Sequence, residues 1–155
     1  MSEMIEVIEN NGILQMSKEE YASYLVSKYV KNCKIYFKDN FDRLGRSTVF
    51  SSGGRITGRY IVFNKKVLEL FNMREYKQLI LHEIAHQLTP YHDHDKVYRK
   101  KAIEIGVDEG STGKKFMSAP FWKVAKAIGW NRTRKTSKRN VKVNKNGNLN
   151  DWIGE

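Results

Sequence analysis

Residues 79–90 read LILHEIAHQLTP, which is the most informative segment of the chain. Residues from about 74 to 88 contain neither glycine nor proline, so we expect one helix that stops shortly before Pro90. Six apolar side chains give that helix a broad apolar surface: Leu79, Ile80, Leu81, Ile84, Ala85 and Leu88. Such a surface is typical of a helix that is buried beneath a cleft.

Two histidines, His82 and His86, stand four residues apart on this helix. Residues at that spacing lie on one face of a helix, one turn apart, so their imidazoles can converge on one cation. Zn²⁺ prefers neutral imidazole nitrogens at ~2.0–2.1 Å in a tetrahedral site. Glu83 is adjacent to the first histidine, where it can take a proton from a water molecule and pass it to a leaving amine. The pattern H-E-x-x-H therefore predicts a zinc metalloprotease with Glu83 as its catalytic base.

A catalytic zinc usually takes three protein ligands, and several residues compete for the third place. All four histidines of the chain lie between positions 82 and 94. His92 follows His86 at the spacing of metzincins, although Thr89 stands where those proteins have glycine. His94 is eight residues from His86, and Glu104 resembles the distant glutamate ligand of other zincins. The residues alone leave these alternatives open.

The neighbouring segments predict a mixture of helices and strands. Ser17-Lys18-Glu19-Glu20 has the pattern of a capping box and predicts a helix over about 17–31. Strands are expected at 33–37, 47–51 and 58–63, and helices at 65–71, from His94 or Asp95 to Ile105 with Gly106 closing it, and at 120–128. This order predicts a single α+β domain with a small, mostly antiparallel sheet packed on helices.

One family shares the pattern around the histidines. The run Leu81 to Pro90, then His94-Asp95-Lys96-Val97-Tyr98, then Ala102 and Ile105-Gly106, resembles the SprT-like domain family. These are zincin-type metalloproteases related to the DNA–protein crosslink protease Spartan, and many are bacterial or phage proteins. His94 with Tyr98 matches the family's His-Gly-x-x-aromatic motif, except that Asp95 stands where glycine is commoner.

The resemblance implies a zincin-like fold and a zinc site made by His82, His86 and His94, with Glu83 as the base. The composition and the resemblance together predict three parts of the chain: an N-terminal arm (1–16), the metalloprotease domain (17–130) and a basic C-terminal tail (131–155). The segment from Gly58 to Asn64 resembles the edge strand that precedes the active-site helix in this family, where substrate backbone can bind by strand addition.

The charge of the chain is large and unevenly spread. The net charge is +11, yet residues 1–20 contain five Glu and one Lys. Residues 131–145 contain seven basic residues and no acidic one. We expect the tail to contact DNA or RNA phosphates, through Arg132, Arg134, Lys135, Lys138 and Arg139 above all. A solvated tail with no partner is the alternative interpretation.

The remaining composition limits the location and the class of protein. No apolar run approaches the ~18 residues of a membrane span, and the acidic start has no secretory signal. Cys33 is the only cysteine, which excludes a cysteine zinc ribbon and favours a reducing, cytoplasmic setting. The leading prediction is a cytoplasmic zinc-dependent protease that cleaves peptide bonds, with DNA-associated proteins as implied substrates. The alternative is a nucleic-acid-binding protein whose metal is structural or vestigial.

Overall fold

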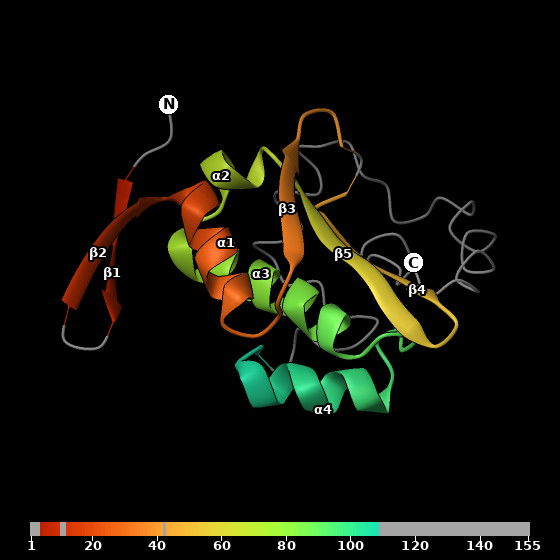
Figure 1. Cartoon of the computed structure of the whole chain (residues 1–155). Helices are drawn as coiled ribbons and strands as arrows, with labels where there is room; N and C mark the ends of the chain where they lie inside the picture. Colours follow the sequence, from red (N-terminus) through yellow and green to blue (C-terminus); the bar gives the residue numbers. More distant parts are fainter. Residues whose placement is uncertain (1–3, 10–11, 42, 109–155) are drawn as a thin grey trace, which may run out of the picture.

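The structure, a computed structural model, describes residues 4–9, 12–41 and 43–108 (Figure 1). Five strands and four helices follow one another along these residues: β1 (Met4–Glu9), β2 (Gly12–Ser17), α1 (Lys18–Ser27), β3 (Cys33–Lys38), β4 (Gly45–Ser52), β5 (Arg55–Asn64), α2 (Val67–Leu70), α3 (Met73–Leu88) and α4 (Lys96–Ile105). The predicted α+β class is confirmed. None of these helices is long and apolar enough to cross a lipid bilayer.

A three-stranded sheet with the order β3-β5-β4 forms the centre of the domain. β4 pairs with β5 in antiparallel fashion, whereas β3 pairs with β5 in parallel. The segment Gly58–Asn64 was expected at the sheet edge, and this expectation is wrong, because it belongs to β5 and has neighbours on both sides. Ile61 and Phe63 of this strand are fully buried, and β-branched and aromatic side chains of this kind pack best between neighbours in the middle of a sheet. The two edge strands are β3 and β4, and β4 is the one that contacts α3.

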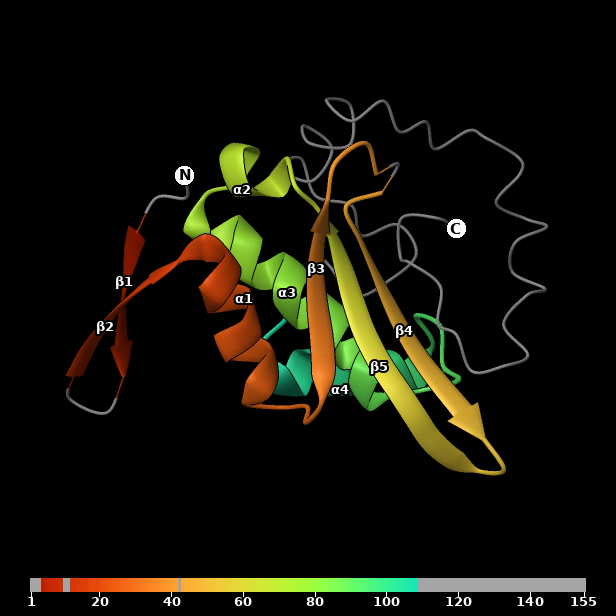
Figure 2. The ribbon, with the colours of Figure 1, turned by 45° about the horizontal axis from the view of Figure 1, so that its top comes forward.

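The helices α1 and α3 lie on one face of this sheet, and α4 packs beside α3 (Figure 2). α3 supplies the centre of the core, where Tyr76, Leu79, Ile80 and Ile84 are fully buried. The Tyr76 hydroxyl donates a hydrogen bond to the Lys18 carbonyl at 2.5 Å and joins α3 to the start of α1. The predicted metal helix is therefore the most enclosed helix of the described residues.

Each long helix starts at a residue whose side chain caps it. The Ser17 capping box predicted from the sequence is present, with Glu20 as its partner, although α1 ends at Ser27 rather than near 31. α3 begins with a second capping box, formed by Asn72 and Glu75. Asp95 caps α4, which ends at Gly106 with a φ of 110°, a conformation that glycine adopts without strain.

The first residues form a β-hairpin where the sequence suggested only an arm. β1 and β2 pair in antiparallel fashion, with Ile5 opposite Met16 and Ile8 opposite Ile13. Met16 is buried, and Ile5 packs against the core, so one face of the hairpin is attached to the domain. Ile8 and Ile13 lie on the other face and are exposed.

Candidate metal centre

α3 brings His82 and His86 to one side of the helix, as their spacing predicts. Both imidazoles are fully buried, and their ring centroids lie 5.1 Å apart. The helix continues only to Leu88 because Thr89, which precedes Pro90, leaves the helical conformation at φ −129° and ψ 63°. The Thr89 hydroxyl donates to the Ala85 carbonyl at 2.8 Å, which caps a free carbonyl at this end.

His94 comes to the same place from the loop between α3 and α4. It adopts a positive φ of 43°, which is uncommon for a residue with a side chain, and it is 1% exposed. Two contacts hold it there. The Arg99 guanidinium donates from Nε to the His94 carbonyl at 3.1 Å, and the next residue, Asp95, is fixed as the cap of α4 through the Tyr98 amide at 3.0 Å.

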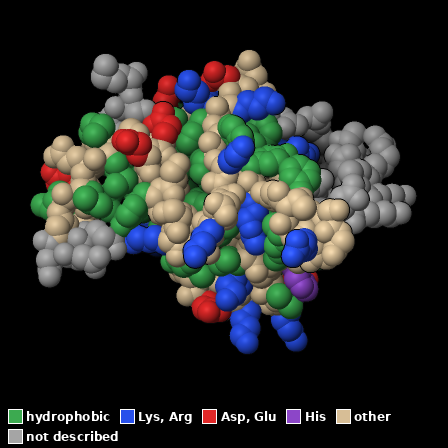
Figure 3. Space-filling model, viewed as in Figure 1, with side chains coloured by type: hydrophobic (Ala, Val, Ile, Leu, Met, Phe, Trp, Pro, Cys, Tyr) green, Lys and Arg blue, Asp and Glu red, His purple; other side chains and the backbone are tan. Residues whose placement is uncertain are grey.

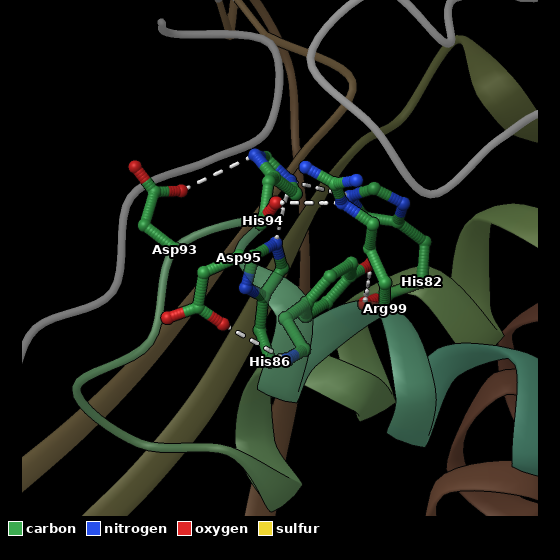
Figure 4. Close-up of polar contacts among 7 residues, drawn as sticks. His82, His86, Asp93, His94, Asp95 and Arg99 are labelled. Carbon is green, nitrogen blue, oxygen red and sulfur yellow. Dashed lines mark hydrogen bonds and ion pairs between the residues drawn. The ribbon is translucent and has the colours of Figure 1, made fainter.

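The three imidazoles converge through their Nε2 atoms (Figure 4). His94 Nε2 lies 3.0 Å from His86 Nε2 and 3.2 Å from His82 Nε2. Nitrogens at ~2.0–2.1 Å from a tetrahedral zinc would be roughly 3.3–3.4 Å apart, so the observed spacing is close to that of a zinc site. The three residues are therefore close enough to hold one metal ion, and all three are buried.

Neighbouring groups orient the rings. An Asp93 carboxylate oxygen lies 3.2 Å from His94 Nδ1, which favours a proton on Nδ1 and leaves Nε2 as the donor to a metal. The Tyr98 ring stacks on His86 with centroids 4.3 Å apart, and its hydroxyl donates to the His82 carbonyl at 3.2 Å. The Tyr98 ring is thus in contact with the rings of all three histidines.

Burial also selects the protonation state that a metal requires. Burial lowers the pKa of His86 well below its ordinary value, because it disfavours the charged imidazolium. The nearby His94 lowers this pKa further, whereas Asp93 raises it. A metal binds the neutral imidazole, so a ring that resists protonation is suited to the role of ligand. The donor set, three buried imidazoles, fits Zn²⁺.

The Glu83 side chain extends from α3 toward the edge strand β4. Its side chain is fully buried, and its carboxylate lies against Gly45, the first residue of β4. A Cβ atom at position 45 would be 3.1 Å from Glu83 Oε2, so the absence of a side chain there makes room for the carboxylate. The Ser47 hydroxyl donates to the Glu83 carbonyl at 3.2 Å. Two residues of β4 thus adjoin the predicted catalytic base.

Gln87 is a site residue that the sequence did not single out. Its buried amide nitrogen lies within hydrogen-bond distance of three acceptors: Ser47 Oγ at 2.7 Å, the Thr48 carbonyl at 3.0 Å and the Tyr60 carbonyl at 3.1 Å. The Arg59 guanidinium donates to the Gln87 carbonyl at 2.8 Å and to its Oε1 at 3.3 Å. We name these contacts the Gln87 clamp, because they join α3 to both β4 and β5 one residue after His86. A polar residue at a core position of α3 was the only signal available in the sequence.

The other sequence candidates lie apart from this cluster. His92 is half-buried, and its Nδ1 lies 2.7 Å from an Asp95 carboxylate oxygen, outside the three converging rings. Glu104 is exposed on α4 and pairs with Lys101 at 3.3 Å. Partial burial raises the pKa of the Cys33 thiol to about 11, while Arg59 lowers it, so this thiol is protonated at neutral pH.

The predicted nucleic-acid contacts Arg132, Arg134, Lys135, Lys138 and Arg139 lie outside the described residues, as does the helix expected at 120–128. No protein-family model, curated protein or solved structure matches this chain.

Proposed function

We propose that this protein is a zinc-dependent metallopeptidase with a zincin-like fold, of the SprT-like kind. The observation that carries the proposal is the convergence of three buried imidazoles from H-E-x-x-H and the following loop, with the buried Glu83 on the same helix. A purely structural metal site has no use for a carboxylate at that position. The alternative, a binding protein with a structural metal, does not explain why a buried carboxylate stands at position 83.

In this proposal His82, His86 and His94 hold the ion. When bound, Zn²⁺ supplies a Lewis acid that lowers the pKa of a coordinated water from about 15.7 to about 7. Glu83 accepts the proton of the attacking water and delivers it to the amine that leaves when the peptide bond breaks. Gly45 and Ser47 assist by leaving room for the Glu83 carboxylate and by holding the backbone that carries it.

The substrate class follows from the strand beside Glu83. β4 pairs with β5 on one side only, and within the described residues no strand pairs with its other side. An extended peptide can add to such an edge through backbone hydrogen bonds, which recognise the chain without requiring a particular sequence. We propose that extended segments of proteins bind along β4. The resemblance and the basic residues of 131–145 support DNA-associated proteins as the natural substrates.

The first test is metal content, measured by elemental analysis. We expect about one zinc per chain in the wild type, a site without zinc in His94→Ala, and retained zinc in the matched control His92→Ala. Loss of zinc with His92→Ala alone would contradict the proposed third ligand. Wild-type protein prepared without chelators that holds no metal would overturn the metal site itself.

The second test separates an enzyme from a binding protein. Glu83→Gln keeps the size of the side chain and removes the base. We expect this variant to bind zinc as the wild type does but to lose cleavage of an unfolded protein such as casein, assayed with and without single-stranded DNA. Equal cleavage by the variant would refute the assigned role of Glu83. Absence of cleavage by the wild type under both conditions would favour the binding-protein alternative.

A further inference from the structure

The sheet face opposite α3 carries a row of three aromatic rings, one from each strand. Tyr60 of β5 lies in the middle, with its ring centroid 6.2 Å from that of Tyr36 on β3 and 5.6 Å from that of Phe50 on β4. Tyr36 is 49% exposed and Phe50 is 40% exposed. Gly58 lies opposite Phe50 in the ladder, and a Cβ there would be 3.4 Å from the Phe50 ring. We call Tyr36, Tyr60 and Phe50 the aromatic row.

Strand alternation explains why these rings face outward. In β3 the residues at 33, 35 and 37 turn toward the helices and are partly buried, while Lys34, Tyr36 and Lys38 are exposed on the other side. In β5 the buried Ile61 and Phe63 alternate with Tyr60 and Val62 in the same manner. The aromatic row therefore lies outside the core, where large rings have no packing role toward the helices.

The charge of this face has one sign. Lys34 and Lys38 of β3 and Arg46 of β4 share the face of the aromatic row, and the three strands contain no acidic residue. Lys34 and Lys38 flank Tyr36 on the exposed side of β3. Figure 3 shows Lys and Arg side chains interspersed with hydrophobic ones over this part of the molecule. The sheet face thus combines exposed rings with basic side chains.

This combination selects a polyanion that also carries flat apolar faces. An acidic peptide or a phosphate polymer satisfies the lysines but offers no surface that stacks on rings. A nucleic-acid duplex hides its base faces, and its bases rise about 3.4 Å per step, less than the ring spacing seen here. Single strands expose their bases and can spread them, and aromatic side chains on a sheet are a recurrent platform for them.

We propose that the aromatic row and its lysines bind single-stranded nucleic acid. Tyr36, Tyr60 and Phe50 stack on successive bases, and Lys34 and Lys38 contact the phosphates. The metal centre lies on α3, on the other side of the sheet, so this binding surface is separate from it. The inference does not depend on the proposed peptidase activity, and either can fail alone.

The test uses the full chain and a fluorescently labelled oligothymidine of ~12 nucleotides, with binding followed by anisotropy. We expect Tyr36→Leu and Phe50→Leu each to weaken binding about tenfold, because a stacked ring is replaced by a side chain without a flat face. Tyr36→Phe keeps the ring and should bind like the wild type. Tyr29→Leu, which changes an exposed tyrosine outside the sheet, is the matched control.

A second ligand distinguishes binding through base stacking from binding through charge alone. That charge includes the basic residues of 131–145. Inorganic polyphosphate is a polyanion without bases, so the ring substitutions should leave its binding unchanged. Lys34→Gln should weaken both ligands and reduce the dependence of log K on log salt for the oligonucleotide by about 0.7. The proposal would be overturned if the ring variants lost affinity equally for both ligands, or if they bound the oligonucleotide as tightly as the wild type. It would also be overturned if the wild type preferred duplex DNA.

A measurement on the unmodified chain guards against variants that fold poorly. An oligonucleotide containing iodouracil, irradiated in complex with the wild type, should crosslink to Tyr36, Tyr60 or Phe50, as identified by mass spectrometry of the digested protein. Crosslinks confined to residues outside the three strands would assign the binding to another surface and reject this one.

Discussion

At the scale of single residues, His94 uses its two ring nitrogens for different purposes. Nε2 faces the other two histidines, whereas Nδ1 faces the Asp93 carboxylate at 3.2 Å. A carboxylate behind a ligand histidine fixes its tautomer and raises its basicity. The His94 backbone itself has an uncommon positive φ. The position of the ring is therefore restrained both by its backbone and by the Asp93 carboxylate. If the site binds zinc, part of the affinity must therefore come from Asp93.

The first prediction concerns that carboxylate. Asp93→Asn keeps the shape of the side chain and removes its charge, so we expect zinc affinity to fall about 10- to 100-fold. Competition with a chelator of known affinity measures the change. Asp108→Asn is the control, because the Asp108 carboxylate is exposed and pairs with Arg74 at 3.6 Å. Equal zinc affinity in Asp93→Asn and the wild type would show that the carboxylate has no such influence.

The second prediction concerns the space beside Glu83, the proposed catalytic base. In Gly45→Ala the new methyl group would be 3.1 Å from Glu83 Oε2 and 3.3 Å from its Cδ, so the buried carboxylate must shift. We expect the kcat for peptide cleavage to fall at least tenfold with zinc content unchanged, because a small misplacement of a catalytic group is costly. Gly58→Ala, whose methyl would meet Phe50 at 3.4 Å, should retain activity. Full activity in Gly45→Ala would mean that Glu83 tolerates the shift.

At the scale of helices and strands, the sequence predicts what is encoded locally. The capping box at Ser17, the glycine after Ile105 and the proline after Thr89 each act within one turn, so helix positions follow from a few neighbouring residues. The convergence of His82 with His86 is local in the same sense, since it depends only on the helical repeat.

Strand neighbours depend on residues far apart in the chain, and there the sequence was a poor guide. The parallel pairing of β3 with β5 joins Cys33 to Arg59, and nothing in either segment specifies the other. The Gln87 clamp has the same origin, because its acceptors lie on strands 27 to 40 residues away. The position of β4 beside Glu83 could not be predicted for this reason, although it defines the proposed substrate edge.

The third prediction tests the Gln87 clamp. Gln87→Leu would leave Ser47, Thr48 and Tyr60 with buried acceptors that have lost a donor, which should lower the free energy of unfolding by about 2–4 kcal/mol. Urea unfolding measures this. Gln78→Leu is a matched control on the same helix, since Gln78 bonds to Gly106 and Asp108 at the surface, where water can replace it. A similarly small decrease in the free energy of unfolding in both variants would show that the Gln87 clamp contributes little to stability.

At the scale of the whole molecule, the two sides of the sheet have different compositions. The helix-covered side contains the core and the three histidines, and the other side carries exposed rings and basic groups. The centre of the core is thus adjacent to three imidazoles whose Nε2 atoms are close enough to bind one cation. Metal binding and folding should therefore be coupled in this protein.

The last prediction follows from that coupling. A ligand that binds only the folded state stabilises it by about 4 kcal/mol when its concentration is roughly 1,000 times its Kd. For a chain of this length such a gain raises the Tm on the order of 10 °C. We expect scanning calorimetry to show a Tm lower by this amount after dialysis against a chelator. The Tm should recover when zinc is added back. His94→Ala should melt near the metal-free wild type and ignore added zinc, whereas His92→Ala should respond as the wild type does. A Tm that is the same with and without zinc would mean that packing alone holds the three rings, including their contacts with the Tyr98 ring.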